Sequence, residues 1–491
     1  MGKSKDKTSR HLEVERKFDV LETTVSPSFD GLSSVVRVER SPEHSLEAVY
    51  FDTPDHDLAA RRITLRRRTG GTDAGWHLKL PAGPDARTEV REPLGDDDAV
   101  PETLRDTVLA IVRDRPLVPV ARISTRRTVD LLYGPDGTAV AEFCDDRVSA
   151  ATEPDGPRQS WREWELELVG GADRDLLDRL SNRLIDAGAV PAASGSKLAR
   201  VLSESSEPEE VPRPADPVHR AVAEQVEELI EWDRAVRADV FDSVHQMRVV
   251  TRKIRSLLQS ARDSFGISDD AWVLDELRQL AAILGVARDA EVLAERYART
   301  LDDLPRELVR GPVRERLVDG AQRRYAAGLR RSLIAMRSQR YFRLLDALEG
   351  LVAAQPAAQH DEDKHGRVTI GAAYKRVRKA AKSAAEADAD RDEALHRIRK
   401  GAKRLRYTAA ATGAAKVSDR AKAIQSLLGD HQDSVVSRTH LGQQADAAHA
   451  AGEDTFTYGL LYRIEEELAR RSREQLDGAL KKLAKAVRKA R

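Results

Sequence analysis

The chain has 491 residues, of which 41% are hydrophobic, 33% charged and only 4% aromatic, and its formal net charge is zero. This length exceeds one ordinary core, so we expect two globular domains. A single cysteine, Cys144, excludes an internal disulfide framework and a cysteine-based zinc site, and favours a cytoplasmic protein. Met1–Arg10 lacks a hydrophobic signal segment and no apolar run could span a bilayer, so we expect neither export nor a membrane partner.

The two halves of the chain carry opposite net charge. Residues 1–205 hold 30 Lys and Arg against 37 Asp and Glu, and the remainder holds 52 against 45. An acidic half can bind cations and a basic half can attract anions, although charged residues often simply solvate a surface.

The N-terminal half has the pattern of an α+β domain. Alternating segments separated by Gly, Pro and Asp turns predict strands at Leu12–Val20, Leu46–Asp52, Arg62–Arg68, Trp76–Pro81, Arg122–Leu132, Val140–Asp145 and Arg162–Leu168. Helices are expected at Leu104–Val112 and Asp173–Ala187. Ser203–Pro217 is dense in Pro, Ser and Glu. We therefore expect a disordered tail at 1–10, a folded domain at 11–203 and a linker at 204–215.

Four of the predicted strands, and the further alternating segment at residues 87–91, each have one charged face, because successive side chains of a strand point to opposite sides. These faces carry Glu13, Glu15 and Lys17; Thr64, Arg66 and Arg68; His77 and Lys79; Arg87, Glu89 and Arg91; and Glu165 and Glu167. A sheet with one face in solvent would show the same alternation. Acidic pairs on the first and last strands, with basic pairs between them, favour instead a closed antiparallel barrel around a charged tunnel.

Such a tunnel would suit phosphate chemistry. Its glutamates could hold Mg²⁺ or Mn²⁺, since these hard cations prefer carboxylate oxygens. Its arginines and lysines would bind phosphate oxygens. A metal and a basic clamp are the usual apparatus of phosphoryl transfer, in which a metal-activated water would attack a terminal phosphorus. We expect Cys144 to be a packed, inert thiol.

The segment HLEVERKF, at residues 11–18, resembles the ExExK signature of the CYTH superfamily. This superfamily of triphosphate tunnel metalloenzymes includes thiamine triphosphatase, inorganic triphosphatases and class IV adenylate cyclases. The segments YFDTPDHDLAARRITLRRRTG, WHLKL, WELEL and SGSKLARVL follow in the family's order, up to residue 202.

The resemblance implies site residues. Catalytic roles would belong to Glu13, Glu15 and Lys17. Metal binding would belong to Glu13, Glu15, Asp145, Glu165 and Glu167. Triphosphate binding would belong to Lys17, Arg66, Arg68, Lys79, Arg127 and Lys197. A one-residue slip in register would exchange Arg127 for Arg126, or Asp145 for Asp146.

From residue 216 onward, long amphipathic helices predict an all-α domain that extends to residue 491. A Gln, Pro, His and Asp-rich segment near 353–366 separates halves at about 216–352 and 367–491. The segment VHQMRVVTRKIRSLL aligns with LHRIRKGAKRLRYTA, and LGVARD aligns with LGDHQD. We therefore expect two pseudo-symmetric helical bundles.

The repeated helices each place basic residues along one side. The first basic rail consists of His245, Arg248, Arg252 and Arg255, and the second of His396, Arg399, Lys403 and Arg406. A solvated face would explain one such helix, but two copies favour a polyanionic partner. The two histidines could contact either the anion or the backbone, and a basic stripe disfavours metal ligation.

The repeated helices resemble the CHAD domain, a helical module that often follows a CYTH domain and is associated with inorganic polyphosphate. The likeness covers residues 216–491 and implies that both rails line one groove or pore that binds polyphosphate.

We therefore expect a metal-dependent triphosphatase that hydrolyses inorganic triphosphate or short polyphosphate in the tunnel, while the helical domain binds polyphosphate. One alternative is a non-catalytic polyphosphate-binding protein associated with granules. Another is class IV adenylate cyclase activity, which the attached helical domain disfavours. Few aromatic residues accompany the basic ones, so we do not expect nucleic-acid binding. The oligomeric state and the choice of metal stay open.

Overall fold

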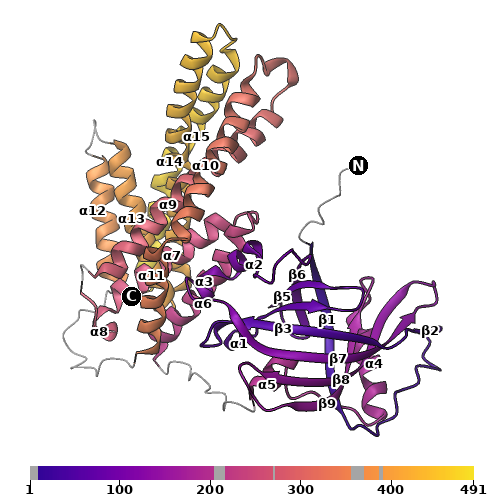
Figure 1. Cartoon of the computed structure of the whole chain (residues 1–491). Helices are drawn as coiled ribbons and strands as arrows, with labels where there is room; N and C mark the ends of the chain where they lie inside the picture. The colour runs from indigo at the N-terminus through magenta and orange to yellow at the C-terminus, as the bar shows by residue number, and fades with distance from the viewer. Residues whose placement is uncertain (1–8, 204–215, 269–270, 355–369, 386–390, 491) are drawn as a thin grey trace. The chain divides into compact units, whose positions relative to one another are not determined.

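The computed structural model describes residues 9–203, 216–268, 271–354, 370–385 and 391–490 (Figure 1). The chain divides into two compact units, residues 1–257 with 333–355, and residues 258–332 with 356–491. Most of the predicted tail, the whole predicted linker at 204–215 and most of the predicted break at 353–366 lie outside the described residues. Ser9 and Arg10, assigned to the tail from the sequence, begin the first strand.

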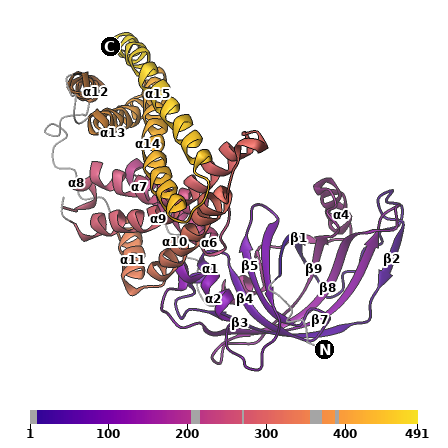
Figure 2. The same ribbon diagram turned by 90° about the horizontal axis from the view of Figure 1, so that it is seen from above.

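Eight antiparallel strands of the first unit form a closed barrel (Figure 2). In ring order they are β1 (Ser9–Val20), β6 (Ala86–Glu92), β5 (Gly75–Pro81), β4 (Thr64–Thr69), β3 (His44–Asp52), β7 (Val118–Tyr133), β8 (Ala139–Thr152) and β9 (Gln159–Leu168). The ring closes because the first half of β1 pairs with β6 and its second half pairs with β9. Outside the ring, β2 (Arg37–Arg40) pairs with β7, and β10 (Val190–Pro191) pairs with β1.

Short helices complete the barrel domain. They are α1 (Asp57–Ala60), α2 (Glu102–Thr107), α3 (Leu109–Val112), α4 (Arg174–Asp186) and α5 (Lys197–Ser203). The helix predicted at Leu104–Val112 is two helices that meet at Val108. Asp52 fixes the turn that leads into β4, since its carboxylate accepts hydrogen bonds from the backbone N–H groups of Thr53, Leu58 and Ala59.

The outward faces of the strands are apolar and pack beneath helices. Phe143 and Trp164 belong to one buried core with the leucines of α4. Leu198 and Val201 of α5 pack into a second core with residues of β7 and β8. Because side chains alternate along a strand, the charged residues between these apolar ones point into the barrel. The apolar core of this domain therefore lies between the strands and the helices that cover them, and the charged side chains line the inside of the barrel.

The rest of the described chain is helical. The first unit adds α6 (Pro217–Arg237), most of α7 (Ser243–Ser260) and α11 (Gln339–Ala353). The second unit contains α8 (Arg262–Phe265), α9 (Trp272–Asp302), η1 (Arg306–Leu308), η2 (Glu315–Asp319), most of α10 (Gly320–Met336), α12 (Ile370–Ala385), α13 (Arg391–Ala411), α14 (Ala415–Ala450) and α15 (Phe456–Lys489). Across the described ranges, no helix combines the length and apolar character needed to cross a membrane.

Helices α12 to α15 share one apolar core in the second unit. It includes Val377 of α12, Leu405 of α13, Leu428 of α14 and Leu483 of α15, all of them buried. Helices α9 and α10 are in close contact at Gly328, where an added Cβ would lie 2.8 Å from the backbone N and Cα of Ala287. The absence of a side chain at Gly328 therefore sets how closely the two helices pack.

We predict that Gly328→Ala destabilises the second unit by about 2 kcal/mol, because the new methyl group would force two helix backbones apart. Gly478→Ala on α15 is the matched control, since its added Cβ would meet no atom within 4 Å. The control should gain about 0.5–1 kcal/mol from its higher helix propensity. Scanning calorimetry of both variants tests the prediction, and equal transition temperatures would contradict it.

Candidate active site

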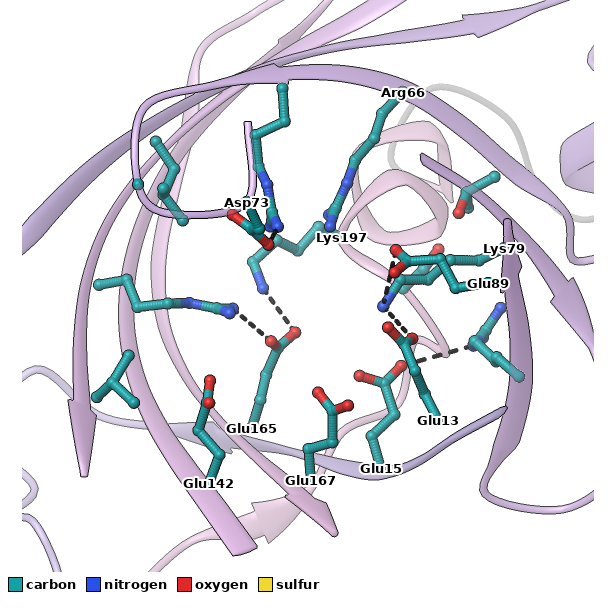
Figure 3. Close-up of a pocket in the computed structure, with 18 of the residues that line it drawn as sticks. Glu13, Glu15, Arg66, Asp73, Lys79, Glu89, Glu142, Glu165, Glu167 and Lys197 are labelled. Carbon is teal, nitrogen blue, oxygen red and sulfur yellow. Dashed lines mark hydrogen bonds and ion pairs between the residues drawn. The ribbon is translucent and has the colours of Figure 1, made fainter. Parts of the chain in front are cut away.

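The barrel encloses a charged cavity of about 440 Å³ (Figure 3). Ten of the residues selected from the sequence line it: Glu13, Glu15, Lys17, Arg66, Arg68, Lys79, Arg127, Glu165, Glu167 and Lys197. They come from β1, β4, β5, β7, β9 and α5, so the closed ring brings together side chains that are far apart in the sequence. The predicted clustering of acidic and basic groups is therefore present in the fold.

Carboxylates line one side of the cavity in Figure 3. Strand register places Glu142 of β8 opposite Glu167 of β9, and Glu167 opposite Glu15 of β1. We call Glu15, Glu167 and Glu142 the carboxylate row. Like charges on paired strands repel, and neither Glu142 nor Glu167 forms an ion pair with any described residue. The row therefore suits a hard divalent cation, for which carboxylate oxygens are the preferred ligands.

The pKa values along this side reflect the crowding. Burial raises the pKa of Glu167 to about 7, and the negative charges of Glu13, Glu15 and Glu142 add to the effect. Burial alone would also raise the pKa of Glu15, but the ammonium groups of Lys17 and Lys79 together lower it to about 2. Glu167 thus binds a proton at a pH where Glu15 stays ionised.

Arg66 lies on the opposite side of the cavity from the carboxylate row (Figure 3). Arg66 donates a hydrogen bond to the Tyr50 hydroxyl at 3.2 Å. Burial and the nearby charges of Arg66 and Arg127 lower the pKa of Arg68 to about 9. Positive charge therefore exceeds its local compensation at Arg68, which is the electrostatic condition for an anion site.

A second group of carboxylates is already paired with cations. The Nζ atom of Lys197 lies 2.9 Å from Asp146 and 2.7 Å from both Glu163 and Glu165. Arg127 also donates to Asp146 and Glu165, and Lys17 donates to Glu165. An ammonium group has three N–H donors, so three carboxylates use all of them. In this structure Lys197 holds carboxylates in place, although the sequence assigns it to phosphate binding.

The register ambiguities from the sequence are resolved by the barrel. Arg127 points inward and Arg126 does not line the cavity. Asp145 points away from the cavity, against its assignment as a metal ligand, and accepts hydrogen bonds from Arg162 and Ser26. Asp146 takes the inward position because Glu142, Cys144 and Asp146 alternate with Asp145 along β8. The barrel thus selects Asp146 for the inward position, the alternative that a one-residue slip in register had left open. Cys144 is buried, and burial raises the pKa of its thiol well above the usual range.

Sequence reasoning also left several inward groups without a role. The clearest are Glu163, which shares the alternation of Glu165 and Glu167 on β9, and Glu142, which lies on the same face of β8 as Asp146. Glu89 was placed on a charged face, and its carboxylate lies 2.9 Å from Nδ1 of His77. Burial lowers the pKa of His77 to about 4, and the charges of Arg66 and Arg68 act in the same direction. Ligand atoms of His11, Glu13 and Glu89 lie within 4.8 Å of one another, as do those of Asp146, Glu163 and Glu165, so each group could hold a metal ion.

The two basic rails lie on α7 and α13, in different units. Every member of the second rail is half-buried, because this face of α13 turns toward α14. Arg406 donates to the side-chain oxygen of Gln425 at 3.2 Å, and the guanidinium of Arg399 lies 3.3 Å from the place where a Cβ of Gly429 would stand. The second rail therefore lies against α14 rather than on an open helix surface.

The sequence matches the CYTH domain family over residues 11–198 and the CHAD domain family over residues 220–442. Two proteins of Mycobacterium tuberculosis, the uncharacterized proteins MT2285 and Rv2226, are each 67% identical over 506 residues. The match spans 98% of this chain and 98% of each of them.

Among solved structures, the chain is similar to the CHAD domain from the plant Ricinus communis, with a TM-score of 0.41 and 23% identity over 54% of this chain and 90% of that one. It is also similar to PptA from Streptomyces chartreusis, with a TM-score of 0.45 and 18% identity over 55% of this chain and 100% of that one. At these scores the likenesses carry no weight for function.

The raised pKa of Glu167 predicts a pH-dependent stability change. Folding favours the protonated acid, so with chelator present the free energy of unfolding falls as pH rises from about 4.5 to about 7. We expect Glu167→Gln to remove this loss and to stabilise the protein at pH 8 by about 2 kcal/mol, with little effect at pH 5.

Thermal unfolding of both proteins at the two pH values measures this difference. Glu43→Gln, at an exposed position before β3, is the control and should show no pH-dependent gain. A gain from Glu167→Gln of equal size at pH 5 and pH 8 would argue against the raised pKa.

Proposed function

Because this chain belongs to the family of proteins in which a CYTH domain is followed by a CHAD domain, we propose that it is a metal-dependent hydrolase of inorganic triphosphate or short polyphosphate. One observation supports this most directly. A row of carboxylates that lacks basic partners for Glu142 and Glu167 lies in the same cavity as Arg66 and Arg68, and the positive charge of Arg68 is incompletely compensated. A chain of phosphates with bound cations would complement both sides.

The carboxylate row, with Glu13, would hold Mg²⁺ or Mn²⁺. When bound, such a cation neutralises phosphate oxygens and lowers the pKa of a coordinated water. Arg66 and Arg68 would bind the terminal phosphate through their planar donor forks and stabilise the charge that develops during transfer. Lys79, which lies 2.5 Å from Glu13, would bridge the carboxylate side and the phosphate side. The enclosing barrel keeps these groups in a fixed geometry, which is the main contribution a protein makes to phosphoryl transfer.

The composition of the wall favours a substrate without a base. Among the described residues that line the cavity, only Tyr50 and His44 have aromatic side chains. The Tyr50 hydroxyl also accepts from Arg66. A nucleotide would need an apolar or aromatic surface for its base. Class IV adenylate cyclase activity and a purely binding role remain the alternatives to hydrolysis.

We further propose that the helical domain binds longer polyphosphate through its basic rails and associates with polyphosphate granules in the cytoplasm. The half-buried second rail supports this, because its cations lie against α14 instead of extending fully into solvent. Partly buried cations with fixed partners lose less side-chain entropy on binding an anion than flexible surface lysines do.

The decisive experiment measures phosphate release by the whole chain from tripolyphosphate, ATP and long-chain polyphosphate, with Mg²⁺ or Mn²⁺ and with chelator. Metal-dependent release from tripolyphosphate in excess of ATP supports the proposal. Pyrophosphate and cyclic nucleotide from ATP would identify a cyclase. Polyphosphate binding without turnover of any substrate would favour the binding role.

We predict that Glu15→Gln lowers kcat/KM for tripolyphosphate at least about 100-fold, because it removes one carboxylate from the row that would hold the metal. Asp145→Asn is the matched control, since Asp145 lies on the outward face of β8 and bonds Arg162. Its kcat/KM should stay within about twofold of wild type. Steady-state kinetics with both metals provides the measurement, and equal losses in the two variants would exclude this assignment.

For the helical domain, we predict that the triple variant Arg399→Ala, Lys403→Ala and Arg406→Ala weakens binding of long-chain polyphosphate. The slope of log affinity against log salt should decrease by roughly two, because three cations no longer displace counterions. Hydrolysis of tripolyphosphate should be unchanged. The control is Arg470→Ala with Arg471→Ala on α15, where both arginines pair with Glu467. If the slope of log affinity against log salt is unchanged in the triple variant, polyphosphate binds at a site other than the second rail.

A further inference from the structure

A carboxylate already lies where the cavity arginines would receive a phosphate. Asp73 belongs to the loop of residues 70–74 between β4 and β5, and it forms an ion pair with Arg68. Figure 3 shows Asp73 on the same side of the cavity as Arg66 and Lys197. The side chain of Arg68 is only 6% exposed, whereas that of Asp73 is 32% exposed. An anion that enters from solvent would therefore meet Asp73 before it reached Arg68.

The backbone of this loop is held independently of the Asp73 carboxylate. The carbonyl oxygen of Asp73 lies 2.9 Å from Nε2 of His77, and Nδ1 of the same ring lies 2.9 Å from Glu89. Gly70 has a positive φ of 80°, and an added Cβ there would stand 2.2 Å from the carbonyl oxygen of Ser45. The turn and the histidine contact place the loop, so the carboxylate can leave Arg68 by side-chain rotation alone.

The charge balance favours displacement of this carboxylate. Burial and the charges of Arg66 and Arg127 keep the pKa of Arg68 near 9 in the presence of Asp73. Arg127 is itself paired with Asp146 and Glu165, so the one partly exposed carboxylate of Asp73 faces the two guanidinium groups of Arg66 and Arg68. A phosphate group brings more negative charge and more acceptor oxygens than a carboxylate, and it can accept from several guanidinium groups at once.

We propose that Asp73 is an internal competitor for the phosphate site at Arg68, so that a phosphate group of the substrate must displace its carboxylate to bind. This inference rests on the proposed function, because it assigns a role to the same cavity. The competition selects for strongly charged anions: a ligand with one negative charge gains little by replacing Asp73, whereas a polyphosphate gains further contacts along the cavity. The returning carboxylate would also assist the release of orthophosphate.

The test is Asp73→Asn, which keeps the size of the side chain and the backbone contact to His77. We expect KM for tripolyphosphate and the inhibition constant of orthophosphate each to fall about fivefold, with kcat within about twofold of wild type. Asp73→Ala should shift both constants in the same direction, which covers the case in which the asparagine amide still contacts Arg68. Circular dichroism verifies that each variant is folded.

The chain offers a closely matched control. Asp98 forms an ion pair with Arg67 at 2.9 Å, and the side chain of Asp98 is 81% exposed. Arg67 directly precedes Arg68 on β4. Asp98→Asn removes the same charge from an arginine whose side chain alternates away from the cavity, so both constants should stay at their wild-type values. A fall of equal size in this variant would reveal a general charge effect and overturn the assignment to Asp73.

Failure of the inference and failure of the proposed function have different signatures. If the wild-type protein releases no phosphate from tripolyphosphate, the proposed function fails, and calorimetric binding of tripolyphosphate and orthophosphate still measures the competition. Tighter binding by both Asp73 variants supports the inference with or without turnover. Binding equal to or weaker than that of wild type, in folded variants, overturns it.

Discussion

The enclosure of opposite charges inside one barrel is the constraint on which the rest of the structure depends. Removing an ion from water costs several kcal/mol unless a partner of opposite charge takes the place of the solvent. Glu165 meets this requirement through Lys17, Arg127 and Lys197, which reach it from three different elements. Because each partner comes from a separate part of the sequence, the ion pairs form only when the ring closes. The barrel shape and its internal charge balance are therefore one property.

Two kinds of carboxylate result from this arrangement. Asp146, Glu163 and Glu165 are neutralised by the protein itself and act as structural counter-ions. Glu142 and Glu167 have no such partners among the described residues, and the raised pKa of Glu167 shows the cost. A binding site is expected where the charge of a buried group is incompletely compensated, because a ligand of opposite charge can supply the missing compensation. The same reasoning applies to Arg68 on the opposite wall.

Alternation along single strands was sufficient to predict the inward residues Glu13, Glu15 and Lys17 of β1 and Glu165 and Glu167 of β9, since period-two patterns depend only on local geometry. Arg127 and Lys197 were assigned through the family resemblance, and Lys197 lies on a helix. Along β8 alternation left the choice between Asp145 and Asp146 open, because a slip of one residue exchanges the two faces of a strand. The pairing between strands could not be predicted from the sequence, so the position of Glu142 opposite Glu167 was not predicted either. Asp73 lies in a loop that has no period, and only the folded hairpin brings it to Arg68. The half-burial of the second rail likewise depends on α14, which a single amphipathic helix does not reveal.

The position of Lys197 has a consequence for biosynthesis. It is the first residue of α5, the last helix of the barrel domain, and its ammonium group joins carboxylates of β8 and β9. A nascent chain emerges from the ribosome with its N-terminal part first. All eight barrel strands are therefore outside the exit tunnel before this counter-ion arrives. Until then Asp146, Glu163 and Glu165 share fewer cations than in the finished domain. We therefore expect the charge balance inside the barrel to be completed only when α5 packs against it.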